Sequence, residues 1–356
     1  MKTITIFLFL LVPTTLLVSG CNSVGFYGQA INGQMQLLTA RQSISRLIDD
    51  PTTDPTLRQR LQTVAKMRAF ASNDLALPDN ASYKSYVELN RPYVLWNIFA
   101  APEFSLTAKQ WCFPVAGCVS YRGYFSEKRA NAYATKLRKA GFDTEVAGIS
   151  AYSTLGWFND PLLSSMMSRS DMALAGTLFH ELAHQQLYVK NDTRFNESFA
   201  VAVELEGVRL WLKKQGEEKQ YKDYLLRIKR KREFIALVQD THKQLAKLYA
   251  QDISDAAKRD AKNNIFLQLK KDYVGLKQSW NNYRGYDIWF DRKLTNASLV
   301  PISSYNDYVP AFQALLKNNS NNLGAFYRDA HRIGKLAPID RKAALVHLMG
   351  PNKPNT

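Results

Sequence analysis

The spacing of hydrophobic residues divides the first half of the chain between helices and strands. Apolar residues three or four positions apart predict amphipathic helices, and runs rich in branched and aromatic residues predict strands. Pro51 and Pro55 separate the first two predicted helices, and Gly141 ends the third. The predicted helices cover residues 29–49, 56–72 and 126–139, and the predicted strands cover residues 92–102, 115–121 and 144–152.

The second half of the chain follows helical spacing almost without interruption. A predicted helix that begins at Arg194 ends at Gly216, and residues 220–251 and 255–280 then form a long helical hairpin. No linker or internal repeat separates these elements into several domains. Together the predicted helices and strands indicate an α+β fold that is mostly α-helical, with a small mixed sheet. Shorter C-terminal helices are predicted over residues 305–317, 323–333 and 340–348.

The N-terminus has the pattern of an export signal. Lys2 precedes an apolar run that is too short to span a membrane and ends in Leu-Val-Ser-Gly-Cys at residues 17–21. This ending resembles a bacterial lipobox, which implies a signal peptide over residues 1–20 and an acyl anchor on Cys21. By analogy with lipoprotein sorting, Asn22 favours the periplasmic side of the outer membrane over the inner membrane. The alternative is simple secretion with Cys21 as a free thiol.

Export to the periplasm would allow the remaining cysteines to form a disulfide. Cys112 and Cys118 are the only pair left, and they would lie in an oxidising compartment. We expect a disulfide that closes a tight loop, and the alternative is two buried thiols. No histidine lies nearby in the sequence, which argues against a metal site there.

The chain is strongly basic. Its 47 Lys and Arg outnumber 31 Asp and Glu, and much of the excess lies within residues 209–243. Such charge can indicate nucleic-acid binding, but export to the periplasm and the helical spacing of apolar residues in this stretch argue against it. The pattern favours a solvated helix face, with anionic lipid headgroups or acidic peptides as the next candidate partners.

A His-Glu-Leu-Ala-His motif carries the clearest chemical signal. On a helix, His180 and His184 project from one face and can bind a single Zn²⁺. Glu181 lies beside them, where a general base for water activation must be. Ser170 or Asp171 can cap such a helix. The alternative is a buried helix whose two histidines hydrogen-bond to their neighbours.

A second motif, Asn-Glu-Ser-Phe-Ala at residues 196–200, supplies Glu197 as the natural third zinc ligand. Together the two motifs resemble those of the gluzincin metallopeptidases, and the resemblance implies a zincin-like core with this Glu as a ligand. Those enzymes usually have a longer gap between the motifs. Here twelve residues separate His184 from Glu197, and nineteen separate it from Glu204. Glu204 is therefore the alternative ligand, and otherwise supports the ligands from the same helix face.

Several further segments carry a second resemblance, which spans nearly all of the mature chain. These segments are residues 25–30, 33–34, 113–118, 121–124, 154–158 and 309–312. The chain resembles a family of bacterial lipoproteins described as predicted zinc aminopeptidases, which implies Zn²⁺ and a peptide substrate. We therefore expect residues 21–356 to form one zincin-like peptidase domain. Its expected parts are N-terminal helices over 21–90, sheet and zinc helices over 91–216, the hairpin over 217–285 and C-terminal helices over 286–356.

The resemblance to gluzincin aminopeptidases also implies a tyrosine that donates to the oxyanion of the transition state. Tyr305 is the expected donor, with Tyr308 and His331 as alternatives. Asp160 is a candidate for binding the free amine of a substrate. The predicted strand over residues 144–152 is either an edge that pairs with the substrate backbone or an ordinary member of the sheet.

The sequence is compatible with two functions. One is a zinc-dependent aminopeptidase of the cell envelope, in which Zn²⁺ polarises the scissile carbonyl and Glu181 moves the proton. The other is a non-catalytic envelope lipoprotein with a structural zinc site and a hairpin that binds a partner. A structural site has no need of Glu181, so its presence favours the enzyme.

Overall fold

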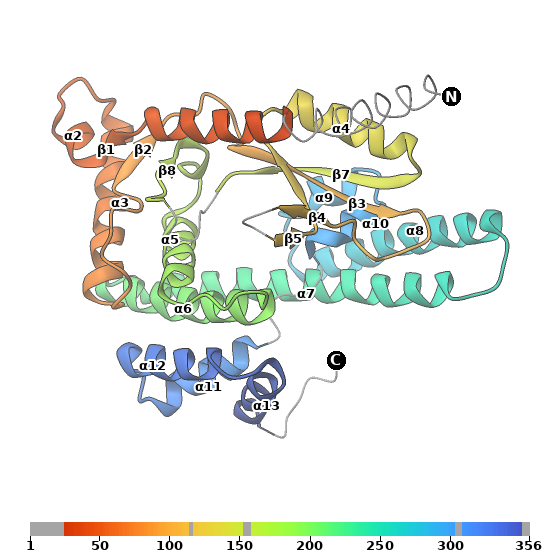
Figure 1. Cartoon of the computed structure of the whole chain (residues 1–356). Coiled ribbons are helices and arrows are strands. Elements are labelled where there is room, and N and C mark those ends of the chain that lie inside the picture. The colour runs from red at the N-terminus through yellow and green to blue at the C-terminus, as the bar shows by residue number, and fades with distance from the viewer. Residues whose placement is uncertain (1–24, 114–116, 152–157, 303–307, 351–356) are drawn as a thin grey trace, which may run out of the picture.

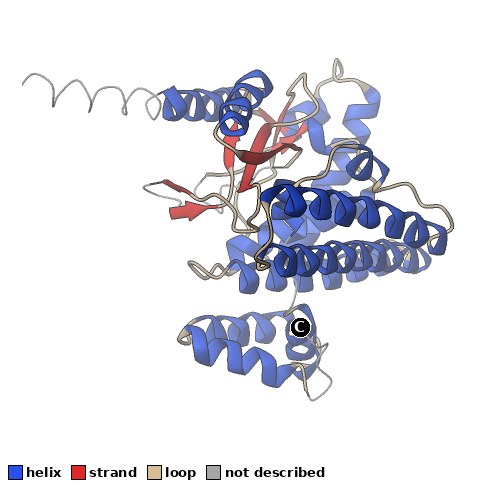
Figure 2. Cartoon of the chain, turned by 90° about the vertical axis from the view of Figure 1, so that its right-hand side faces the viewer, coloured by secondary structure: helices blue, strands red, loops and turns tan. Residues whose placement is uncertain are grey.

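A computed structural model describes residues 25–113, 117–151, 158–302 and 308–350 of this chain. Helices dominate it, and the small sheets lie on one side of the central helices (Figure 1; Figure 2). The signal peptide predicted over residues 1–20 and the predicted anchor at Cys21 lie outside the described residues. Among the helices described, none is both long and apolar enough to cross a membrane.

Two helices in contact, α5 (Asp171–Gln186) and α6 (Thr193–Lys214), form the centre of the main core. On one side they pack against α3 (Pro55–Asn73). On the other, the short C-terminal helices α11 (Val309–Asn318), α12 (Leu323–Gly334) and α13 (Pro338–Leu348) lie together beneath α6 (Figure 1). The side chains that fill this core include the fully buried Phe179, Phe195, Phe199, Phe312 and Phe326.

The main sheet has three antiparallel strands, with β3 (Leu95–Pro102) between β6 (Arg122–Tyr124) and β7 (Phe142–Ile149). Helix α4 (Glu127–Lys139) packs against this sheet. Strand β7 therefore lies at an edge of the sheet, as one of the two interpretations of residues 144–152 requires. Whether it pairs with a substrate stays a prediction.

A second small sheet joins β1 (Gln42–Ser43), β2 (Ser85–Val87) and β8 (Leu162–Leu163) in that order. Strand β2 pairs antiparallel with β1 and parallel with β8, so this sheet is mixed.

A β-hairpin holds the expected disulfide. It pairs β4 (Trp111–Phe113) with β5 (Gly117–Val119), and Cys112 lies directly opposite Cys118 in the register. These two cysteines are bonded to each other, which confirms the predicted disulfide.

A long helical hairpin extends from the main body, as predicted (Figure 1). It consists of α7 (Glu218–Tyr249) and α8 (Asp255–Ser279), followed by the short α9 (Asp287–Asp291) and α10 (Asn296–Leu299). The hairpin has an apolar core of its own, separate from the main core. Its members include Phe234, Leu245, Phe266, Leu269, Tyr273, Trp280 and Phe290.

One predicted element is wrong. Residues 29–49 do not form a single helix, because a helix over residues 25–39 ends before β1, and α2 (Ile44–Asp49) then begins anew. One tertiary and one local contact explain the break. Strand β1 pairs with β2, and the Ser43 hydroxyl accepts a hydrogen bond from the Arg46 amide, which caps α2.

Candidate metal centre

Helix α5 carries the first motif, and local signals fix where it begins. Ser170 caps the helix by accepting a hydrogen bond from the Ala173 amide at 3.4 Å, and Asp171 follows in the first turn. The helix buries Leu174, Leu178 and Leu182 in the main core. His180, Glu181 and His184 therefore lie in the second half of a well-anchored helix.

A short loop returns the chain so that the start of α6 lies beside the end of α5. Asn196 is buried, and its side chain clamps this loop through both polar groups of Val189. The Asn196 amide oxygen accepts from the Val189 N–H at 2.7 Å, and its NH₂ donates to the Val189 carbonyl at 2.8 Å. Asp192 then caps α6 through the Phe195 amide. This clamp brings Glu197 to the histidines across a gap of only twelve residues.

Three side chains of metal-ligand type converge between α5 and α6. Glu197 Oε2 lies 3.4 Å from His180 Nε2, and Glu197 Oε1 lies 3.5 Å from His184 Nε2. The two Nε2 atoms are 3.2 Å apart. The ligand atoms of His180, His184 and Glu197 all lie within 4.8 Å of one another, and this group could hold a metal ion.

Glu204 lies on the opposite side of the His180 ring. Its Oε2 is 3.1 Å from His180 Nδ1, while its Oε1 accepts a hydrogen bond from the Tyr224 hydroxyl at 2.6 Å. Gly176 leaves room for this arrangement, because a Cβ there would approach both Glu204 and Tyr224 to 3.2 Å. A carboxylate at this nitrogen fixes the ring orientation and tautomer of a histidine ligand. The geometry therefore favours Glu197 over Glu204 as the third ligand.

Charge and burial set the protonation of the two histidines. Burial lowers the pKa of His180, but hydrogen bonds to Glu197 and Glu204 and the negative charge of Glu204 and Glu181 outweigh it and raise that pKa to about 10. Burial and the nearby charge of His180 lower the pKa of His184 to about 4. At neutral pH and without a metal, His180 therefore carries the extra proton of a charged imidazolium, and His184 is neutral. A divalent cation at this point would displace that proton, because metal-binding histidines are not protonated on the ligating nitrogen.

A cleft of about 410 Å³ opens beside His180. Glu181 is partly buried and lines this cleft beside His180. The walls come from α5, α6, α7 and the segments before α5 and after β7. The lining residues are Ala151, Arg169, Ala173, Thr177, His180, Glu181, Glu204, Arg227 and Lys231.

Comparison with protein families identifies the group to which this arrangement belongs. The family model described as "Putative aminopeptidase" matches residues 25–345, which is most of the chain. The chain belongs to this family. Searches of curated proteins and of solved structures returned no match. The family name suggests a peptidase that acts on peptides, in agreement with the resemblance found in the sequence.

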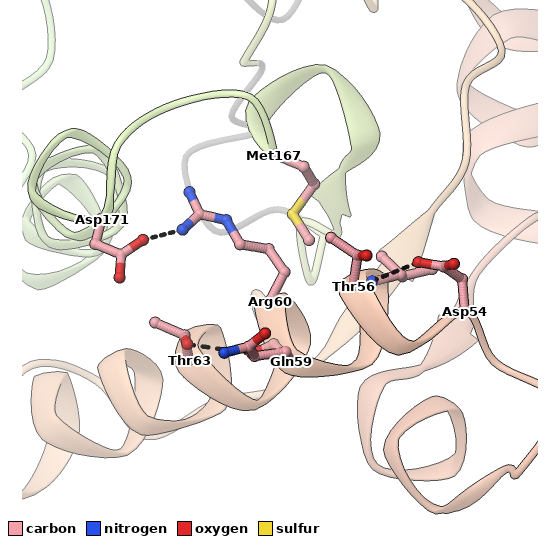
Figure 3. Close-up of a pocket in the computed structure, with 8 residues that line it drawn as sticks. Asp54, Thr56, Gln59, Arg60, Thr63, Met167 and Asp171 are labelled. Carbon is pink, nitrogen blue, oxygen red and sulfur yellow. Dashed lines mark hydrogen bonds and ion pairs between the residues drawn. The ribbon is translucent and has the colours of Figure 1, made fainter.

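Helix α3 supports the segment that leads into the site of this family member. The Arg60 guanidinium pairs with Asp171 at the start of α5 (Figure 3). It also donates to the backbone carbonyl of Arg169. The pocket around Arg60 carries no group of metal ligands among the described residues. Arg60 instead holds the backbone of Arg169, whose side chain lines the cleft beside His180.

Four residues of the site were not predicted from the sequence. Tyr224, Arg227 and Lys231 come from α7, and their spacing of three and then four residues places them on one helix face. That spacing was visible in the sequence, but nothing local indicated which element the face would contact. Arg169 precedes the cap of α5 and had no distinguishing pattern.

The other predicted site residues have different outcomes. Tyr305 lies outside the described residues, so its role stays a prediction. Tyr308 is buried at the start of α11, where its backbone N–H donates to Ser198 Oγ at 3.1 Å.

His331 and Asp160 do not line the cleft. His331 Nε2 lies 3.0 Å from the Gln186 carbonyl at the end of α5, which gives this ring a role in ending the helix. Asp160 is buried, with Arg41 close enough to interact with its charge.

Proposed function

We propose that this protein is a zinc-dependent aminopeptidase with a zincin-like core. The observation that carries the proposal is the convergence of His180, His184 and Glu197, of which His180 lines the same cleft as Glu181. Two imidazoles and one carboxylate are the donor set of catalytic zinc in peptidases, where a fourth position stays open. The family name supports the aminopeptidase class.

A bound zinc ion would supply Lewis-acid polarisation of the scissile carbonyl and of the attacking water. Glu181 takes a proton from that water and delivers it to the leaving amine. Glu204 holds the His180 ring from its Nδ1 side, and the Tyr224 hydroxyl holds Glu204 in turn. We assign Tyr305 as the donor to the oxyanion that develops in the transition state.

We also propose that the mature protein begins at an acylated Cys21, on the periplasmic side of the outer membrane. The lipobox-like residues 17–21 and the disulfide between Cys112 and Cys118 support export, because such bonds persist in oxidising compartments. A Cys21→Ser variant should leave the membrane fraction and carry no lipid by mass spectrometry. Unchanged membrane association would contradict the acyl anchor.

The decisive experiment changes Glu181 to Gln. The amide fills the same space but cannot accept a proton, so zinc content should be unchanged while peptide hydrolysis falls by about 10²–10⁴-fold. Glu206→Gln on α6 is the matched control, because Glu206 pairs with Arg209 and does not line the cleft. Zinc content is measured by atomic absorption, and hydrolysis with aminoacyl and internally quenched peptides.

Two outcomes would overturn parts of the proposal. Activity of Glu181→Gln within about tenfold of wild type would remove Glu181 from the mechanism. A wild-type protein that binds zinc but cleaves none of the peptides would favour the non-catalytic lipoprotein with a structural zinc site.

A further inference from the structure

The cleft carries more positive charge than the proposed chemistry uses. Arg227 and Lys231 lie four residues apart on α7, so they extend from the same face of that helix. Both side chains are exposed to solvent within the cleft lining. Arg169 reaches the same cleft from the segment before α5. Three cations from two separate parts of the fold therefore meet beside His180 and Glu181.

None of these cations forms an ion pair with a carboxylate in the described part of the chain. The partly buried Arg169 guanidinium instead contacts two neutral hydroxyls, donating to Ser150 Oγ at 2.7 Å and to Thr177 Oγ1. Glu181 and Glu204 act on this guanidinium through their charge, but both of these hydrogen bonds go to neutral hydroxyls, and neutral partners compensate poorly for the desolvation of a charge. An anion that entered the cleft would complete the interaction.

The acidic residues of the cleft are already committed. Glu204 contacts both His180 and Tyr224, and Glu181 is the proposed general base. Burial and the positive charge of Arg227 lower the pKa of Arg169, whereas the negative charge of Glu181 and Glu204 raises it. The net effect is a lowered pKa. Beyond the groups needed for chemistry, the described lining therefore presents positive charge to a substrate.

We propose that the cleft binds its peptide substrate through a carboxylate of that peptide, held by Arg227 and Lys231 with Arg169 behind them. This inference rests on the proposed function and names the substrate class: short peptides that carry an anionic group close to the scissile bond. The carboxylate has two possible sources with the same chemistry. One is the C-terminal α-carboxylate of a short peptide, and the other is the side chain of Asp or Glu.

Four tripeptides with free amino ends distinguish the two sources. They combine Glu or Gln at one position with a free or amidated C-terminus, and kcat/KM is measured for each. A charged hydrogen bond in a cleft corresponds to a preference on the order of 10-fold to 100-fold. We expect that preference for the free acid, for the Glu peptides or for both, and we expect it to decrease as salt increases.

Variants test the cations themselves. Lys231→Gln and Arg227→Gln should each bring the ratio of kcat/KM between anionic and neutral peptides down by about tenfold, and Lys231→Glu should reduce it further. Lys229→Gln removes the same charge from the same helix outside the cleft lining, so it should leave the ratio unchanged.

A binding measurement separates this inference from the proposed function. Zinc-loaded Glu181→Gln is titrated with the same four peptides by calorimetry, and the anionic peptides should bind at least about tenfold more tightly. Equal affinities and equal kcat/KM values across the four peptides would overturn the carboxylate subsite. If wild-type protein cleaves nothing while the anionic peptides still bind preferentially, the peptidase proposal fails and the subsite stands.

Discussion

At the scale of single residues, the two carboxylates of α6 differ in the histidine nitrogen that each faces. Glu197 approaches the Nε2 atoms of both histidines, whereas Glu204 approaches only Nδ1 of His180. This difference favours Glu197 as the third ligand, a choice that counting residues left open. The longer gap found in gluzincins would select Glu204, but the Asn196 clamp shortens the loop without moving the ligand away from the histidines.

This difference predicts two grades of zinc affinity. Glu197→Gln should lose well over 100-fold in affinity, because a ligand is lost, whereas Glu204→Gln should lose about 10–100-fold, as for partners behind a ligand. Competition with a chelating dye measures both values, and Glu206→Gln serves as control. A larger loss for Glu204→Gln than for Glu197→Gln would mean that the ligand assignment is reversed.

The sequence predicted the residues whose relation is set by helix geometry alone. His180, Glu181 and His184 follow from a four-residue repeat on α5, and the start of that helix follows from Ser170. Arg169, Arg227 and Lys231 could not be placed in the same way, because α7 reaches the cleft only through its tertiary packing. Only the folded structure shows that these three residues line the same cleft as His180 and Glu181.

At the scale of elements, the connection between α5 and α6 determines whether the site forms at all. Asn196 is 1% exposed and satisfies both polar groups of Val189 in the loop between the helices. In the second motif, the Asn thus holds the loop while the adjacent Glu197 faces the histidines. The motif couples a structural residue to a proposed ligand in consecutive positions.

Asn196→Ala should therefore destabilise the protein. Two backbone groups of Val189 would lose their partner, and an unsatisfied buried group costs about 1–3 kcal/mol. Urea denaturation measures the change in the free energy of unfolding. Asn131→Ala on the exposed face of α4 is the control, with an expected change within about 0.5 kcal/mol. Equal effects of the two substitutions would show that the clamp contributes nothing.

Element boundaries were predictable where a cap or a glycine sets them. Helix α6 ends at Lys214. Gly216, two residues later, has a positive φ of 72°, a conformation that glycine commonly adopts just after a helix. Strands of two or three residues such as β1 and β8 were missed. Their formation depends on pairing with distant β2, and a run that short has no readable periodicity.

At the scale of the whole molecule, α7 belongs to both apolar cores. Its first half contributes Tyr224 to the main core and lines the cleft with Arg227, while Phe234 and Leu245 lie in the core of the hairpin. The hairpin is thus continuous with a wall of the cleft. Because Arg227 and Lys231 lie on α7, the way the hairpin packs against the sheet affects the position of the proposed carboxylate subsite.

One buried ion pair holds the hairpin to the sheet. Lys262 Nζ on α8 lies 2.6 Å from Asp143 Oδ2 on β7 and also donates to the Glu103 carbonyl at 2.8 Å. Asp143 further accepts from the Asn296 amide. A second pair, between Arg259 and Glu103, is solvent-exposed and therefore contributes much less.

We predict that Lys262→Met lowers the free energy of unfolding by about 3 kcal/mol, because Asp143 would remain largely buried without its cation. The double variant Lys262→Met with Asp143→Asn should recover part of this loss, since the neutral amide needs no cation and still accepts from Asn296. Arg259→Gln is the exposed control and should cost less than about 1 kcal/mol. Urea denaturation of the four proteins measures these values. If Lys262→Met costs no more than Arg259→Gln, or the double variant is no more stable than Lys262→Met, the hairpin is held by its apolar contacts and not by this pair.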